Sequence, residues 1–195
     1  MATQASRGDQ PSLADRYRAV RRLSLDLAAA LSDADATLQP HVDASPVKWH
    51  LAHTNWFFET FVLRDHLPGY RPQEERWAYL FNSYYEAEGE RHARPRRGML
   101  SRPSLTEILS WRSAVDAALL DTIDDLPGEL IDLGLNHEQQ HQELMLMDIL
   151  ATFAANPILP AMWDPAPAPT PAPAPAPAPR PAVDRAYCPV GVRAS

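Results

Sequence analysis

The sequence predicts an all-α protein built on a four-helix bundle, with a long loop between the second and third helices and a disordered Pro/Ala-rich tail. Apolar residues recur at steps of three and four in four segments, which is the period of a helix with one buried face. Helix-ending residues flank these segments, and no segment alternates like a β-strand. The chain of 195 residues is long enough for one domain of about 150 residues and a tail.

The first helix is predicted over residues 11–31, with Ser12 as its N-cap. Its apolar stripe consists of Leu13, Tyr17, Val20, Leu23, Leu27 and Leu31. The second helix is predicted to begin with Ser45 as N-cap and Pro46 in the first turn. It runs to about Arg64, shortly before a Pro-Gly pair that ends it.

A long irregular segment over residues 68–103 precedes the third helix. Ser104 and Glu107 form the capping box that starts this helix, and a Pro-Gly pair ends it. Its stripe consists of Leu105, Ile108, Leu109, Trp111, Arg112, Val115, Leu119 and Ile123. The fourth helix covers about residues 129–155. A connection as long as 68–103 is usually functional, and it indicates an arrangement other than a simple up-down-up-down bundle.

The composition divides the chain into three parts. Residues 1–11 are polar and predicted to be disordered, residues 12–160 form the bundle, and residues 161–195 form a linker and short disordered tail. Every second residue from 165 to 181 is proline, which favours an extended polyproline II segment of about 50 Å. Only residues 182–195 follow it, too few for a domain.

Charge and composition exclude several classes of function. A net charge of −7 gives no general attraction to nucleic acid. No apolar run approaches the roughly 20 residues of a membrane span, and the N-terminus lacks the apolar core of a secretory signal. The one cysteine, Cys188, cannot form a disulfide within one chain. We therefore expect a cytoplasmic protein without nucleic-acid or membrane partners.

Two histidines in the fourth helix, His137 and His141, have the spacing at which two imidazoles on one helix face can bind one metal ion. The predicted stripe they share also contains Leu130, Leu133, Leu144 and Asp148. The pair is therefore expected to point into the bundle. Two buried imidazoles need partners for their nitrogens, and a metal ion on one side with a hydrogen bond on the other would provide them.

The second helix offers a third ligand, either His50 or His53, and helical spacing alone does not choose between them. The remaining histidines, His41, His66 and His92, lie near loops or helix ends and are expected to be solvated. Three neutral imidazoles suit Fe(II), Zn(II), Ni(II) or Cu(II), and the ligand type does not select among these metals.

His137 and His141 also fit the H-E-x-x-H pattern of zinc peptidases, in which the glutamate is the general base. Such enzymes usually take a third metal ligand from further along the chain, but no histidine follows His141. The peptidase interpretation is therefore disfavoured, and Glu138 is expected to be a surface residue or an outer neighbour of the metal.

Four motifs occur together in this order: SPVKWHLAHT at 45–54, FNSYY at 81–85, RPRRG at 94–98 and HEQQHQE at 137–143. Together they resemble the N-terminal DinB-like domain of ergothioneine-biosynthesis sulfoxide synthases, over residues 12–160. The resemblance implies a DinB-like four-helix bundle that binds non-haem Fe(II) through His53, His137 and His141. It also implies O2-dependent C–S bond formation between hercynine (trimethylhistidine) and a thiol, with sulfoxidation.

The resemblance further assigns substrate-binding residues. Gln140 matches a glutamine that helps to seat the betaine, and Arg94 and Arg97 match arginines that hold carboxylates of the thiol substrate, γ-glutamylcysteine or cysteine. Members of the family carry a C-terminal domain of the formylglycine-generating or C-type-lectin-like kind, whereas a Pro/Ala tract follows the bundle here. We therefore expect the bundle alone to be inactive and to need a separate domain of that kind.

Two alternatives stay open at this point. One is a stand-alone DinB-like metalloenzyme, a hydrolase or thiol transferase that uses Zn(II) or Ni(II). The other is a non-catalytic protein that offers its polyproline tract to an SH3-like groove.

Overall fold

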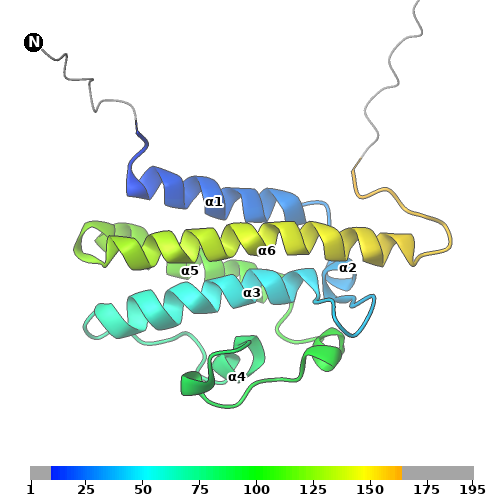
Figure 1. Ribbon diagram of the computed structural model, residues 1–195, viewed down its shortest axis with the longest axis horizontal. Helices are drawn as coiled ribbons and strands as arrows, with labels where there is room; N and C mark the ends of the chain where they lie inside the picture. The colour runs from blue at the N-terminus through cyan, green and yellow to red at the C-terminus, as the bar shows by residue number, and fades with distance from the viewer. Residues whose placement is uncertain (1–9, 164–195) are drawn as a thin grey trace, which may run out of the picture. The chain divides into compact units, whose positions relative to one another are not determined.

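The structure is a computed structural model that describes residues 10–163, and these residues form an all-α bundle (Figure 1). This architecture confirms the predicted fold class. Its long elements are α1 (Leu13–Ala28), α3 (Val47–Phe57) continued by the π-helix η1 (Phe58–Arg64), α5 (Leu105–Thr122) continued by the 3-10 turn η4 (Ile123–Asp125), and α6 (Gly128–Ala154). No helix among the described residues has both the length and the apolar character to cross a membrane. The predictions for residues 1–9 and for the Pro/Ala tract lie outside the described residues.

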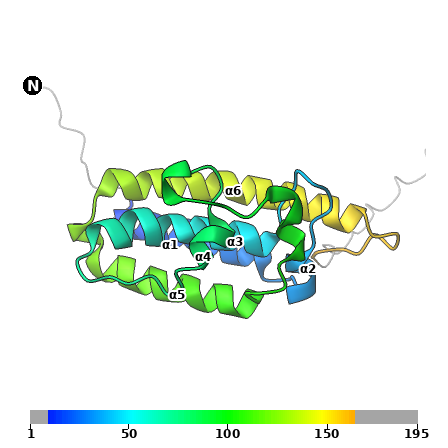
Figure 2. The same cartoon turned by 90° about the horizontal axis from the view of Figure 1, so that it is seen from below.

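α6 lies between α1 and α3, and α5 completes the bundle (Figures 1 and 2). α1 and α6 run in the same direction, so that Arg16 binds Asp132 and, further along both helices, Ser24 binds Gln142. α3 and α5 both run the opposite way (Figure 1). The chain must therefore return along the bundle between them, which explains why residues 65–104 form so long a connection.

Two of the three predicted serine N-caps, Ser12 and Ser104, are confirmed. The Ser12 side chain accepts a hydrogen bond from the backbone N–H of Asp15 at the start of α1, and Ser104 and Glu107 form the expected capping box of α5. α1 ends at Ala28, three residues earlier than predicted.

The prediction that Ser45 caps the second helix is wrong. The N-cap of α3 is Pro46, which has no side-chain cap. The Ser45 hydroxyl instead accepts a hydrogen bond from the Arg97 guanidinium at 2.9 Å. Ser45 therefore ties the long connection to the start of α3.

The long connection contains regular elements that the sequence did not reveal. They are α4 (Trp77–Phe81) and the 3-10 turns η2 (Glu86–Glu88) and η3 (Arg94–Met99); a further short helix, α2 (Asp33–Thr37), follows α1. The connection lies along α3 (Figure 2), where Trp49 donates a hydrogen bond to the carbonyl of Leu80 at 3.0 Å. It thus forms a wall beside α3.

The buried faces of α1 and α6 differ from the predicted stripes. In α1, Leu23 is 47% exposed, whereas Arg21 and Ser24 are buried. In α6, Leu133 and Leu144 are 56% and 38% exposed, so the face predicted to point into the bundle lies at its border. Both segments are helical as predicted, but their buried faces carry polar residues that the predicted stripes leave out.

The buried faces of α1 and α6 differ from the predicted stripes because they share a buried polar cluster centred on Glu138. Its carboxylate accepts hydrogen bonds from Arg112 at 2.6 Å, from Arg21 at 3.0 Å and from the Ser24 hydroxyl at 2.5 Å. Both arginines and Glu138 are at most 2% exposed. The expectation of a surface position for Glu138 is therefore wrong. The three charges are tolerated inside the bundle because they are paired with one another.

Gly134 allows α6 to approach α3 closely. A Cβ atom at this position would lie 2.6 Å from a ring carbon of Phe58 and 2.9 Å from one of Phe57. We predict that Gly134→Ala lowers the free energy of unfolding by about 1 to 3 kcal/mol through overpacking, measured by urea denaturation. Gly128→Ala is the matched control, because its Cβ would meet only an ordinary contact at 3.6 Å; equal stability of the two variants would disprove the steric argument.

Candidate metal centre

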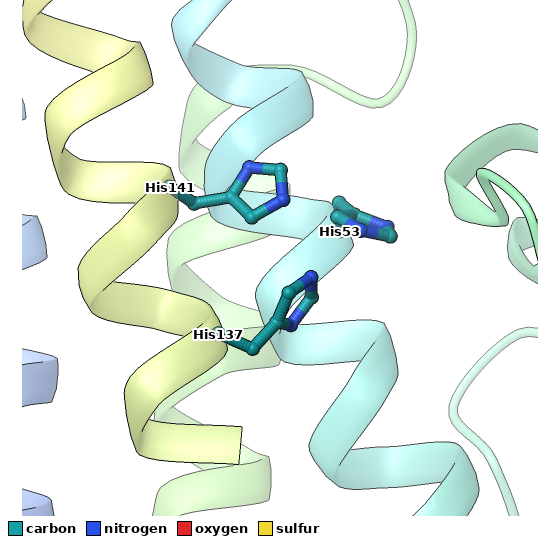
Figure 3. Close-up of side chains that lie close together, drawn as sticks. All are labelled: His53, His137 and His141. Atoms are coloured by element: carbon teal, nitrogen blue, oxygen red, sulfur yellow. The ribbon is translucent and has the colours of Figure 1, made fainter. Parts of the chain in front are cut away.

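Three histidine rings converge between α3 and α6. His53 comes from α3, and His137 and His141 come from successive turns of α6 (Figure 3). Each ring offers one nitrogen such that the three atoms lie within 4.8 Å of one another, and the ring centroids are 4.7 to 4.9 Å apart. The structure thus brings together the three residues that the family resemblance selected, and it chooses His53 over His50 for this cluster.

Hydrogen bonds fix the orientation of two of these rings. The Nδ1–H of His53 donates to the carbonyl oxygen of Phe81 at 2.6 Å, because a carbonyl can only accept. The Nδ1 of His141 lies 2.9 Å from the Nδ1 of His50. In both rings Nδ1 is therefore occupied, which leaves Nε2 as the nitrogen available to a metal ion.

The environment keeps these imidazoles neutral, the form that binds metals. Burial lowers the pKa of His53 well below its ordinary value, and the neighbouring His137 lowers it further. Burial is also the main reason that the pKa values of His137 and His141 are lowered. The Nδ1 of His137 is buried without a hydrogen-bond partner among the described residues. Three neutral imidazoles that each offer a nitrogen within 4.8 Å of the others are a donor set that fits a metal ion.

Aromatic side chains form a dry wall around the cluster. Trp49 stacks on the His53 ring at 4.6 Å, and Trp56 lies stacked at 5.8 Å. Phe57 lies 5.1 Å from His137. All three aromatic residues are buried, as expected of core residues that also exclude water from one side of the cluster.

The remaining four histidines lie outside the three-histidine cluster. His50 is buried next to the cluster, where its Nε2 lies 3.0 Å from the carboxylate of Asp148. His41 is exposed at the rim of the cavity described below, and His66 is exposed on the surface. His92 is partly buried and contacts the carbonyl of Arg96 at 3.0 Å.

A cavity of about 810 Å³ opens beside the three rings. Gln140, Arg94 and Arg97 all line it, so the predicted substrate residues lie around one space. Gln140 is exposed. Arg94 donates hydrogen bonds to the carbonyl of Asp43 and to the hydroxyl of Tyr84.

Arg97 is a buried cation without a carboxylate partner among the described residues. Its guanidinium lies 3.3 Å from the centroid of the Trp49 ring and donates to the hydroxyl of Ser45. Its Nε has no hydrogen-bond partner within residues 10–163. Burial, followed by the charge of Arg94, lowers the pKa of Arg97 to about 9. Arg97 therefore remains a cation at neutral pH beside the histidine cluster.

Comparison with known proteins identifies the fold. The family description of the DinB superfamily matches residues 16–137. The chain belongs to the DinB superfamily. The matched part includes His53 and His137, and His141 follows one turn later. A hercynine oxygenase of Mycolicibacterium smegmatis is 31% identical over 143 residues, which are 69% of this DinB chain and 31% of the relative. The chain therefore spans about a third of the length of that relative.

The sequence did not reveal all parts of this DinB site. The predicted stripe of the fourth helix includes Asp148 but gives it no role, and nothing in the sequence marks the carbonyl of Phe81 as a partner of His53. The sequence suggests His50 only as a possible metal ligand. Its position three residues before His53, together with a carboxylate seven residues after His141, could have suggested a hydrogen-bonded neighbour, but only if α3 and α6 were known to be antiparallel.

Proposed function

We propose that this DinB domain binds Fe(II) through His53, His137 and His141 and contributes the metal-binding part of an enzyme that joins sulfur to hercynine. The main support is the convergence of three imidazole nitrogens within 4.8 Å beside a cavity. The hercynine oxygenase relative adds independent support for the substrate. Fe(II) with open coordination positions would supply the chemistry with O2.

The residues around the cavity suit the two proposed substrates. Arg97, with Arg94 beside it, would hold a carboxylate of a thiol such as γ-glutamylcysteine or cysteine, since guanidinium groups pair with carboxylates in a fixed geometry. Gln140 would orient the betaine end of hercynine. The stacked Trp49 and Trp56 would exclude water from the side of the cluster that faces α3.

We also propose that a domain of the formylglycine-generating or C-type-lectin-like kind completes the site. The chain spans only 31% of its relative, and Leu144 and Met147, which line the cavity, remain 38% and 63% exposed. Turnover by the bundle alone is accordingly expected to be very slow, because one side of the site stays open to water.

The test uses the full chain loaded with Fe(II) under argon. Calorimetric titration with hercynine should give saturable binding that is stronger than binding of histidine, which lacks the trimethylammonium group. Gln140→Leu should weaken hercynine binding selectively. Equal binding of hercynine and histidine would contradict the proposed substrate, and preferential loading with Zn(II) or Ni(II) after anaerobic purification would favour the hydrolase or thiol transferase alternative.

We predict a specific effect of Arg97 on binding of the thiol. Arg97→Lys keeps the charge but loses the planar fork, and Arg97→Met loses both. Affinity for γ-glutamylcysteine should fall in the order parent, Arg97→Lys, Arg97→Met, by about tenfold or more in the last case, because a charged hydrogen bond is typically worth 1.5 to 3 kcal/mol. Arg96→Met is the control, since Arg96 belongs to the same turn but is exposed and does not line the cavity. An equal loss in both Met variants would point to general charge rather than to a specific site.

A further inference from the structure

A series of hydrogen bonds connects the carboxylate of Asp148, through His50, to His141 of the three-histidine cluster. Asp148 Oδ2 lies 3.0 Å from the Nε2 of His50, and the Nδ1 of His50 lies 2.9 Å from the Nδ1 of His141. The same carboxylate oxygen accepts the backbone N–H of Ser45 at 2.8 Å. His50 is 4% exposed, so protein atoms rather than water determine its partners.

This series of hydrogen bonds permits only one arrangement of protons when the rings of His50 and His141 are neutral. The carboxylate of Asp148 can only accept, so the Nε2 of His50 carries a hydrogen atom. The Nδ1 of a neutral His50 is then a lone pair and accepts the Nδ1–H of His141. His141 is consequently held as the tautomer whose Nε2 lone pair is free.

A different contact holds His53 in the same tautomer as His141. Its Nδ1–H donates to the carbonyl of Phe81 at 2.6 Å, so its free lone pair is also on Nε2. The backbone thus orients one ring of the cluster, and a pair of side chains, Asp148 and His50, orients another.

We propose that Asp148 and His50 are positioning residues that fix the tautomer and orientation of His141 and thereby prepare its Nε2 to bind the metal ion. The inference rests on the proposed metal site. His50 acts through His141 and is not itself a member of the cluster whose donor atoms lie within 4.8 Å.

The first test needs neither a variant nor a metal. Long-range ¹H–¹⁵N correlation NMR of the metal-free full chain, with ¹⁵N-labelled histidine, reports which ring nitrogen is protonated. We expect protonation at Nε2 of His50 and at Nδ1 of His141. A His141 protonated at Nε2, or one in an even mixture of tautomers, would overturn the proposal.

The second test measures Zn(II) affinity by competition with a chromophoric chelator. Loss of an outer partner of a ligating histidine typically weakens metal binding about 10- to 100-fold, and we expect this for both His50→Leu and Asp148→Asn. Asp148→Asn should also place part of His141 in the other tautomer, which a purely structural role would not do. Asp132→Asn is the matched control, because Asp132 is on α6 but is ion-paired with Arg16 on the surface, and it should leave Zn(II) affinity unchanged.

The outcomes separate this inference from the proposed function. Unchanged Zn(II) affinity in a folded Asp148→Asn variant would reject the positioning role while leaving the three-histidine site intact. Failure of the parent chain to bind Zn(II) or Fe(II), with the expected tautomers present, would reject the metal site and with it the positioning role.

Discussion

Replacement of both His137 and His141 by alanine is expected to abolish metal binding. The parent chain should take up about one Fe(II) or Zn(II) ion, and the double variant close to none, because one remaining imidazole does not make a site of the usual three or four ligands. Metal content after loading under argon and gel filtration, measured by plasma mass spectrometry, tests this expectation. Equal metal content in the parent and the double variant would refute the assignment of the ligands.

The control for this experiment is His66→Ala, because His66 is exposed and does not line the cavity. It should bind metal as the parent does. Circular dichroism should show that the double variant keeps its helical content, since His137 and His141 are only partly buried. Metal loss in a folded double variant, with none in His66→Ala, would therefore reflect lost ligands rather than unfolding.

Replacement of Glu138 by alanine is expected to be the most destabilising single change in α6. It would leave Arg21 and Arg112 buried without their shared carboxylate, and removing one partner of such a cluster typically costs about 3 to 5 kcal/mol. The free energy of unfolding from urea denaturation measures the effect. Glu143→Ala is the matched control on the same helix, because Glu143 is exposed, and it should change stability by less than about 0.5 kcal/mol.

This result would also bear on the peptidase pattern. A general base must reach a substrate or a metal-bound water, whereas the oxygens of Glu138 are bound by Arg21, Arg112 and Ser24. The geometry therefore predicts a loss of stability rather than a selective loss of activity. Normal stability of Glu138→Ala would show that the cluster is not formed as described.

The stability of the chain should depend on acid through the same carboxylate. Burial alone would raise the pKa of Glu138, but Arg112 and Arg21 outweigh it and hold the pKa at about 2, below the ordinary 4.5. The contribution to stability is therefore complete above about pH 4.5 and is lost as the pH falls towards 2. Urea denaturation between pH 6 and pH 3 should show a steeper decline for the parent than for Glu138→Gln.

Family resemblance and local signals predicted a large part of the site. The ligand candidates His53, His137 and His141 were expected from motifs, and the structure places their rings together. Helical periodicity and caps located the long helices to within a few residues, because both are local properties of the chain.

Other features could not be predicted because they depend on contacts between distant segments. The apolar stripes misled the prediction for α1 and α6, since Arg21 and Ser24 lie inside the bundle only because Glu138 comes from another helix to meet them. Likewise, Ser45 is a helix cap by its sequence but a partner of Arg97 in the fold. A single-helix pattern contains no information about such partners.

The sequence by itself determined the all-α class, the helical segments and the residue types able to bind a metal ion, since these follow from periodicity, capping and the chemistry of imidazole. The tertiary structure brings His53 rather than His50 to the pair on α6, as the family resemblance implies. Only the tertiary structure decided that His50, itself bound to Asp148, is the hydrogen-bond partner of His141. The physical reason is the antiparallel packing of α3 against α6, which sets which nitrogen atoms come within bonding distance.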